Sequence, residues 1–278
     1  MKKLLSLALA AVLLFSMFSL ISCNKEENNK SGVSNYAETT TYDVKDSTGK
    51  VLGTISYKAK GTDYAIVTGY QPRTSDPHSV VIPEVFPGSE RTVVEIGDEA
   101  FRACTSVTSV NLPATVEKIG DWAFYLCSSI YQMDIPANVA SIGKGAFVGC
   151  DALATVKFAE EKPLLTDVGA YAFNACPSIE SIALPEGVEI IGDGAFFECE
   201  ALKAVVLPES VTSIGATAFA KCDALESINL GGNISELGEY AFGTLITDNS
   251  EVLVYAEGTT TANTIQQVLN GEPETDGE

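Results

Sequence analysis

The sequence predicts a solenoid, a stack of similar coils joined by parallel β-ladders, and three observations support this prediction. One phrase returns seven times between residues 93 and 255. Its period is 23 residues, with a single three-residue insertion near residues 160–165. Each copy holds an aliphatic residue followed by glycine, then Ala-Phe, then a short run rich in branched residues. A unit of this length cannot bury its apolar side alone, so we expect the coils to stack.

The N-terminus has the layout of an export signal. Lys2 and Lys3 precede an apolar run that ends in Leu20-Ile21-Ser22-Cys23, a phrase that resembles a bacterial lipobox. We expect a lipoprotein signal peptide over residues 1–22 and lipidation of Cys23. The alternative is an uncleaved membrane span, because the apolar run is just long enough to cross. Either segment would attach the protein to a membrane.

The polar stretch after Cys23 has no apolar periodicity, and it predicts a flexible tether over residues 23–37. Its opening, Lys25-Glu26-Glu27, resembles a signal that sends lipoproteins to the outer face of the outer membrane. We therefore expect an exported lipoprotein of the outer membrane and cell surface.

Both ends of a solenoid expose apolar core and sheet edge, so both need covering. Residues 38–79 contain alternating strand-like runs around turn signals and predict an N-terminal β cap, with an independent ligand-binding domain as the alternative. The solenoid should occupy residues 80–255, beginning with a degenerate coil. Residues 256–278 should form a C-terminal cap, including a short helix over 259–271, and an acidic tail.

Each position of the repeated phrase has a physical reason. The branched run suits a strand, and the proline that often follows it, as at Pro136, belongs where a strand ends. The repeated glycine, as at Gly143, indicates a bend that needs a positive φ or a close approach of two backbones. The Ala-Phe pair predicts small residues where coils pack closely and one internal column of rings. That column is Phe101, Phe124, Phe147, Phe173, Phe196, Phe219 and Phe242.

The pattern I-G-x-x-A-F-x-x-C-x-x-L-x-x-I-x-L-P-x-x-V resembles the BspA-like leucine-rich repeat family of bacterial surface lipoproteins, over roughly residues 80–255. The resemblance implies a right-handed leucine-rich repeat solenoid with a parallel β-sheet on its concave side. It also implies adhesion or ligand binding at the cell surface, without catalytic residues.

Six cysteines recur on the repeat period and should occupy one column: Cys104, Cys127, Cys150, Cys176, Cys199 and Cys222. In the seventh phrase Leu245 stands at this position, which favours a role in core packing. Disulfides between neighbouring coils are the alternative, because the coil spacing lies within the range that they span. A zinc site is disfavoured, since there is no CxxC pair and His78 is the only histidine.

Charge and motif content exclude several classes of function. The formal charge of −20 disfavours nucleic-acid binding. We expect His78 to lie in a solvated loop, and no acid, base and nucleophile converge in the sequence. No phosphate-binding loop or calcium loop is present. We therefore expect a protein that is not an enzyme and that needs no cofactor or metal.

Residues that differ between coils are the candidates for recognition. Gln132, Asp134 and Lys157 should point outward from the strands, where an ordinary solvated surface is the alternative. A second group is aromatic, a residue type enriched at binding hot spots, although such rings can also drape over a coil. This group is Trp122, Tyr125, Tyr131, Tyr171 and Phe197. We expect a protein or glycan partner at a cell surface, with capture of a glycan or peptide for nutrient uptake as the alternative. The oligomeric state stays open.

Overall fold

The computed structural model describes residues 39–230, 234–243, 253–255 and 262–263. The predicted signal peptide, Cys23 and the tether lie outside the described residues, as does most of the predicted C-terminal cap and tail. Within the described part, no helix has the length and apolar character required of a membrane span. The two residues described within 259–271 form strand β19, so the helix expected there is wrong at these positions. They pair with the preceding strand instead.

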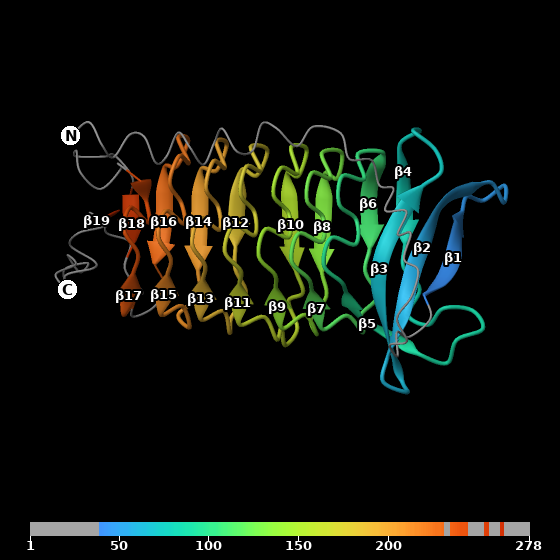
Figure 1. Cartoon of the computed structure of the whole chain (residues 1–278). Coiled ribbons are helices and arrows are strands. Elements are labelled where there is room, and N and C mark those ends of the chain that lie inside the picture. The colour runs from blue at the N-terminus through green and yellow to red at the C-terminus, as the bar shows by residue number, and fades with distance from the viewer. Residues whose placement is uncertain (1–38, 231–233, 244–252, 256–261, 264–278) are drawn as a thin grey trace, which may run out of the picture. The chain divides into compact units, whose positions relative to one another are not determined.

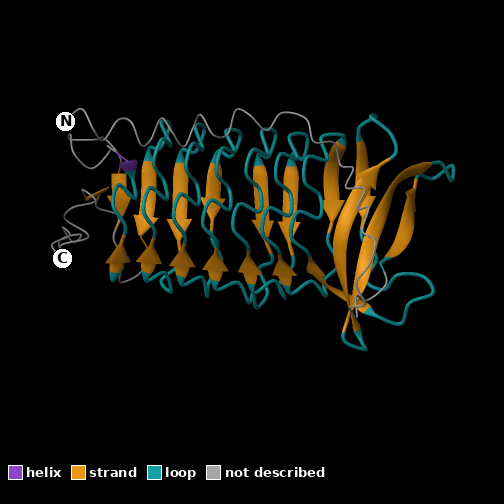
Figure 2. Ribbon diagram, viewed as in Figure 1, coloured by secondary structure: helices purple, strands orange, loops and turns teal. Residues whose placement is uncertain are grey.

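The coils stack through two rows of parallel strands, which confirms the solenoid (Figures 1 and 2). One row belongs to a ten-stranded sheet in the order β1-β2-β3-β5-β7-β9-β11-β13-β15-β17. Its strands are β1 (Thr40–Lys45), β2 (Val51–Lys60), β3 (Tyr64–Pro72), β5 (Thr92–Ile96), β7 (Lys118–Ile119), β9 (Ser141–Ile142), β11 (Asp167–Val168), β13 (Ile190–Ile191), β15 (Ser213–Ile214) and β17 (Glu236–Leu237).

The second row consists of longer strands that form three shorter sheets, β4-β6, β8-β10 and β12-β14-β16-β18-β19. Its strands are β4 (His78–Val81), β6 (Val107–Asn111), β8 (Gln132–Ile135), β10 (Thr155–Phe158), β12 (Ser181–Ala183), β14 (Ala204–Leu207), β16 (Ser227–Leu230), β18 (Leu253–Tyr255) and β19 (Ala262–Asn263). Buried and solvent-facing residues alternate along most of these strands, as in β14, where Val205 and Leu207 are buried and Val206 is exposed.

The N-terminal strands extend the first row only. β1, β2 and β3 pair antiparallel, and β3 pairs parallel with β5. The predicted strands therefore exist and lie against the first coil. Their role as a stabilising cap stays a prediction.

A column of phenylalanine rings runs through the core, as predicted. The seven rings from Phe101 to Phe242 are fully buried. Successive centroids lie 5.1–5.6 Å apart, with interplanar angles of 3–17°. The backbone joins the same coils, since Phe124 N–H donates to the Ala146 carbonyl at 2.7 Å and this contact recurs along the column. The rings thus stack at nearly the spacing of the backbone that carries them.

The repeated glycines are needed because the backbones of successive coils approach closely there, and not because φ is positive. A Cβ on Gly143 would lie 2.6 Å from the Gly120 carbonyl carbon and 2.7 Å from the Asp121 nitrogen of the preceding coil. None of the seven has a positive φ. Of the two reasons that the sequence offered for these glycines, the structure therefore supports only the close approach of two backbones.

Positive φ occurs instead at the second and sixth residues after the repeated glycine, most of which are not glycine. In the second coil these are Trp122 and Leu126, with φ of 55° and 57°. Their N–H groups donate to the Lys144 and Val148 carbonyls of the next coil, both at 2.8 Å. Positive φ is unfavourable for these residues by itself. The hydrogen bonds to the next coil offset this cost, because the turn conformation directs alternate N–H groups along the stack.

The six cysteines are buried thiols in one column, as the packing interpretation predicted. Five of the thiols also donate a hydrogen bond to a backbone carbonyl of the preceding coil, and Cys104 donates to the Tyr70 carbonyl of β3. Cys127 Sγ lies 2.9 Å from the Phe101 oxygen, and Cys150 Sγ lies 3.3 Å from the Phe124 oxygen. The thiol thus adds a weak donor to its apolar volume, a role that packing alone did not predict.

Burial raises the pKa of three of the thiols. The effect holds for Cys150 and Cys199, and it raises the pKa of Cys222 to about 12. Because the thiolate is the reactive species, these cysteines should be inert in the folded protein.

The three-residue insertion changes the second row of strands where it occurs. Within the described strands β10 pairs with β8 but not with β12, which begins a new ladder. Val156 and Phe158 of β10 are only half-buried, although the matching positions in the neighbouring strands are buried. The insertion therefore leaves part of the core accessible beside β10.

The glycine contacts predict a sharp penalty for one added methyl group. Gly143→Ala should lower the free energy of unfolding by at least about 2 kcal/mol, because backbone atoms of the preceding coil must move. Gly69→Ala is the matched control, since its Cβ would meet only the Ser56 Cβ at 3.9 Å. That change should stay within about 1 kcal/mol of wild type. Chemical denaturation measures both, and equal stability of the two variants would contradict the close-approach account.

The cysteine column predicts slow thiol chemistry. In the full chain at pH 8, a disulfide-exchange reagent should modify the six cysteines from Cys104 to Cys222 only at the rate at which the protein unfolds, because all six are buried away from the reagent. Peptide mass mapping before and after denaturation checks this site by site. Rapid labelling of the native column, or disulfides between neighbouring cysteines, would contradict it.

Candidate functional site

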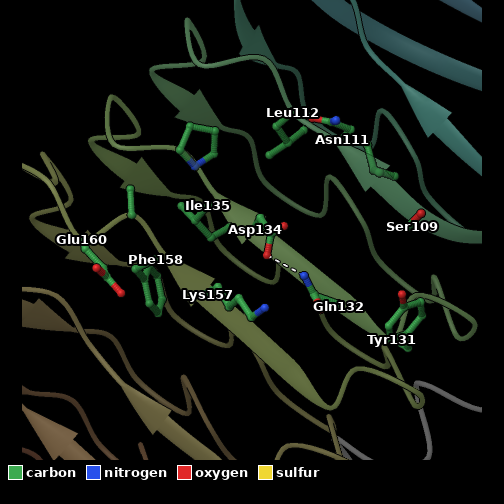
Figure 3. A pocket seen from close by; sticks show the side chains of 13 residues that line it. Ser109, Asn111, Leu112, Tyr131, Gln132, Asp134, Ile135, Lys157, Phe158 and Glu160 are labelled. Carbon is green, nitrogen blue, oxygen red and sulfur yellow. Dashed lines mark hydrogen bonds between the residues drawn. The ribbon is translucent and has the colours of Figure 1, made fainter.

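The second row of strands carries a cavity of about 630 Å³ over β6, β8 and β10 (Figure 3). We call this the strand-face site. Its lining is Ser109, Val110, Asn111, Leu112, Tyr131, Gln132, Asp134, Ile135, Pro136, Lys157, Phe158, Ala159 and Glu160. Each strand contributes because its outward residues alternate with buried ones, and parallel pairing places equivalent positions side by side. Lys157 thus lies opposite Asp134, and Thr155 opposite Gln132.

Polar groups in the site are held in place by neighbours. The Gln132 side-chain amide donates to Asp134 Oδ1 at 2.8 Å, which orients both groups. Lys157 forms no ion pair within the described part of the chain, although Asp134 is beside it in the ladder. Its ammonium group therefore keeps its donors available for a ligand.

Tyr131 provides an exposed aromatic surface at the edge of the site. It immediately precedes β8, and 58% of its surface is accessible. Its backbone bonds to Thr108 on one side and Ala154 on the other, both small residues. Neither neighbour has a side chain large enough to cover the tyrosine ring. The ring can therefore pack against a partner.

Several of the lining residues are not named in the sequence analysis, and two of these, Glu160 and Phe158, add a charge and an apolar ring to the site. Glu160 lies in the segment 160–165 that contains the three-residue insertion, and Phe158 is a half-buried core residue of β10 beside it. The signal available in the sequence was the coincidence of the insertion with Ala159, which replaces the proline of other coils. Together these residues add an anionic group and an apolar surface to the site.

The structure brings together four of the eight predicted binding residues and separates the other four. Tyr131, Gln132, Asp134 and Lys157 line the strand-face site. The remaining four lie in the turns between strands rather than at this site: Trp122, Tyr125, Tyr171 and Phe197.

The turn aromatics contact their own scaffold. A Cβ on Gly145 would collide with the Trp122 ring, so the indole covers this glycine of the next coil. Trp122 and Tyr125 meet edge to face with centroids 5.4 Å apart, and the Arg102 guanidinium lies 5.0 Å from the Tyr125 centroid. Tyr171 covers Gly194 in the same way. These contacts favour the interpretation that the rings drape over the coils.

The expectation that His78 lies in a solvated loop is wrong. His78 is buried and begins β4. Its Nδ1 lies 2.8 Å from the Asp76 carbonyl, to which it donates, and its Nε2 lies 2.7 Å from the Tyr70 hydroxyl. Burial is possible because both ring nitrogens have partners. Among the described residues, no three His, Cys, Asp or Glu side chains gather closely enough to hold a metal ion.

The turn contacts predict a stability effect that distinguishes Trp122 from Tyr131. Trp122→Ala should lower the free energy of unfolding by about 1–3 kcal/mol, because the indole packs on Gly145 and Tyr125. Tyr131→Ala should cost less than about 1 kcal/mol, because that ring is exposed. Thermal or denaturant unfolding of the two variants compares them. An unchanged stability for Trp122→Ala would return this residue to the binding candidates.

Comparison with known proteins identifies the family to which these repeats are similar. A model of the BspA type leucine rich repeat region matches residues 86–167 and 166–250, with six copies. No curated protein matches the sequence.

Solved structures of bacterial proteins share the fold. A leucine-rich repeat protein of T. pallidum is 26% identical over 79% of this chain and 94% of its own, with a TM-score of 0.64. One of Bacteroides ovatus is 34% identical over 73% of this chain and 51% of its own, with a TM-score of 0.63. A leucine rich cell surface protein of Faecalibacterium prausnitzii is 28% identical over 78% and 55%, with a TM-score of 0.60.

The chain thus spans about half the length of the latter two proteins. The family model covers more than half of the present sequence, in the segment that forms the stacked coils. The protein belongs to the BspA type leucine-rich repeat family.

Proposed function

We propose that this chain is a non-enzymatic cell-surface protein whose repeat scaffold binds another protein, including in adhesion to host or neighbouring cells. The observation that carries the proposal is the strand-face site, where outward side chains of three successive coils line one cavity. The family's repeats form binding scaffolds, and one relative is described as a cell surface protein. The proposed export signal and lipidated Cys23 would hold the scaffold at the membrane.

The ladder makes the site suitable for recognition of a macromolecule. Backbone pairing fixes β8 against β10, so Gln132, Asp134 and Lys157 are positioned before a partner arrives. Preorganisation reduces the entropy lost on binding. Seven coils at about 4.8 Å extend over roughly 35 Å, which accommodates a protein interface of ordinary size.

Capture of a glycan or peptide for nutrient uptake is the second candidate. The exposed Tyr131 ring favours it, because an open ring beside the amide and carboxylate of Gln132 and Asp134 suits stacking and hydrogen bonding of a sugar. The glycan form of this candidate differs from the first in that a sugar, rather than the polypeptide of the partner, makes the contact.

A binding test separates these candidates. Proteins captured by the full chain from host and bacterial surface extracts are identified, purified and titrated against variants. Tyr131→Ala and Lys157→Glu should each weaken binding by about tenfold or more, because central aromatic and charged contacts dominate interfaces. Both residues line the strand-face site.

Matched controls are Tyr64→Ala and Lys144→Glu, exposed residues that do not line the strand-face site. They should bind within about twofold of wild type, since surface changes away from a contact have small effects. Loss of binding after enzymatic deglycosylation of the partner would favour the glycan candidate. Wild-type affinity of both site variants would contradict the proposed site.

A further inference from the structure

The second row of strands begins with an open edge. β4 pairs with β6 on one side, and no described strand pairs with its other side. β1, β2 and β3 extend the first row, so they leave this edge uncovered. An unpaired strand edge presents a row of backbone donors and acceptors that a further strand can satisfy.

The alternation of hydrogen bonds identifies the free groups. His78 N–H donates to the Ser106 carbonyl at 3.0 Å, and Ile82 N–H donates to the Asn111 carbonyl at 3.1 Å, both toward β6. Since successive residues of a strand alternate in direction, Val80 also faces β6. The N–H and C=O groups of Ser79 and Val81 therefore face away from β6.

This edge borders a cavity of about 550 Å³, distinct from the strand-face site. Apolar side chains of the β1–β2 hairpin, Tyr42, Val44 and Leu52, line it together with Ser79 and Val81. Val81 is 58% exposed, unusual for a branched apolar residue on an edge strand. The cavity thus combines free backbone groups with apolar surface.

Most charged groups around the cavity have partners, and Lys45 is the cation without an ion pair among the described residues that line it. Lys50 pairs with Asp76 at 3.3 Å, and Asp46 accepts hydrogen bonds from Thr48 and from the Lys50 backbone. Lys45 forms no ion pair within the described residues, although it lines the cavity. Its ammonium group is therefore available to a carboxylate of the occupant.

We propose that the β4 edge is a docking site for an extended peptide segment of a partner protein, which adds a strand beside Ser79 and Val81 and places an acidic residue near Lys45. Only an extended polypeptide repeats donors and acceptors at the spacing that this edge presents. The β1–β2 hairpin shares the cavity with the edge, which favours a single inserted strand over a second sheet. The strand-face site is not required for this interaction.

The decisive variant is Val81→Pro. Proline removes the N–H that faces away from β6 and leaves the β4–β6 bonds in place, a position where edge strands tolerate proline. Short random peptides displayed on phage are selected on the full chain, and synthetic versions of the selected peptides are titrated by fluorescence anisotropy. Binding should weaken by about tenfold or more in Val81→Pro and by about threefold or more in Lys45→Glu.

Val81→Thr is the matched control, because it keeps the N–H in a branched side chain. It should bind within about threefold of wild type, and all three variants should unfold near the wild-type temperature. If Val81→Pro unfolds, hydrogen exchange on the wild-type chain replaces it. A bound peptide should then slow exchange at the Ser79 and Val81 amides.

Several results would overturn the edge proposal. One is an affinity of Val81→Pro equal to that of wild type. Others are hydrogen exchange at Ser79 and Val81 that does not change when a peptide binds, or the absence of any selected peptide. Selected peptides that instead lose affinity with Tyr131→Ala would also overturn it, and they would support the strand-face site. The two sites can therefore fail separately.

Discussion

The spacing of the parallel backbone ladder, about 4.8 Å, is the constraint on which the rest of the molecule depends. Every column of side chains must fit it. The repeated glycines meet it by having no Cβ, because the backbones at Gly120 and Gly143 are in contact. The phenylalanine rings meet it by lying nearly parallel at 5.1–5.6 Å. The turns meet it by adopting positive φ, which directs N–H groups into the next coil.

This constraint separates residues that build the scaffold from residues that can recognise a partner. Positions that face the interior must be nearly identical in every coil, whereas outward strand positions can vary without disturbing the stack. Asn111, Asp134 and Lys157 occupy the same outward position in three coils and differ in charge. The insertion then breaks the regularity at β10, where Phe158 and Glu160 enter the strand-face site. The outward residues that differ between coils and the insertion that interrupts the repeat therefore lie in the same site.

Periodicity alone predicts the coils, the phenylalanine column and the burial of the cysteines, because each follows from spacing along the chain. It does not predict turn conformation, since the positive φ at Trp122 depends on a hydrogen bond to the Lys144 carbonyl in another coil. The expectation for His78 was wrong for a similar reason, because its partner Tyr70 lies in β3, a strand of the other row. Four of the eight predicted binding residues line the site, and three of them lie on strands, where outward positions follow from alternation. The role of the turn aromatics does not follow from the sequence, because only the fold shows that Trp122 covers Gly145.

The most direct test of the account is a hydrogen-exchange footprint of the full chain bound to a purified protein partner. The account predicts that protection on binding is concentrated in residues 109–112, 131–136 and 157–160, with the turn residues around Trp122 and Tyr171 unchanged. A footprint on the turns, with no protection along β6, β8 and β10, would contradict the claim that recognition resides on the strand face.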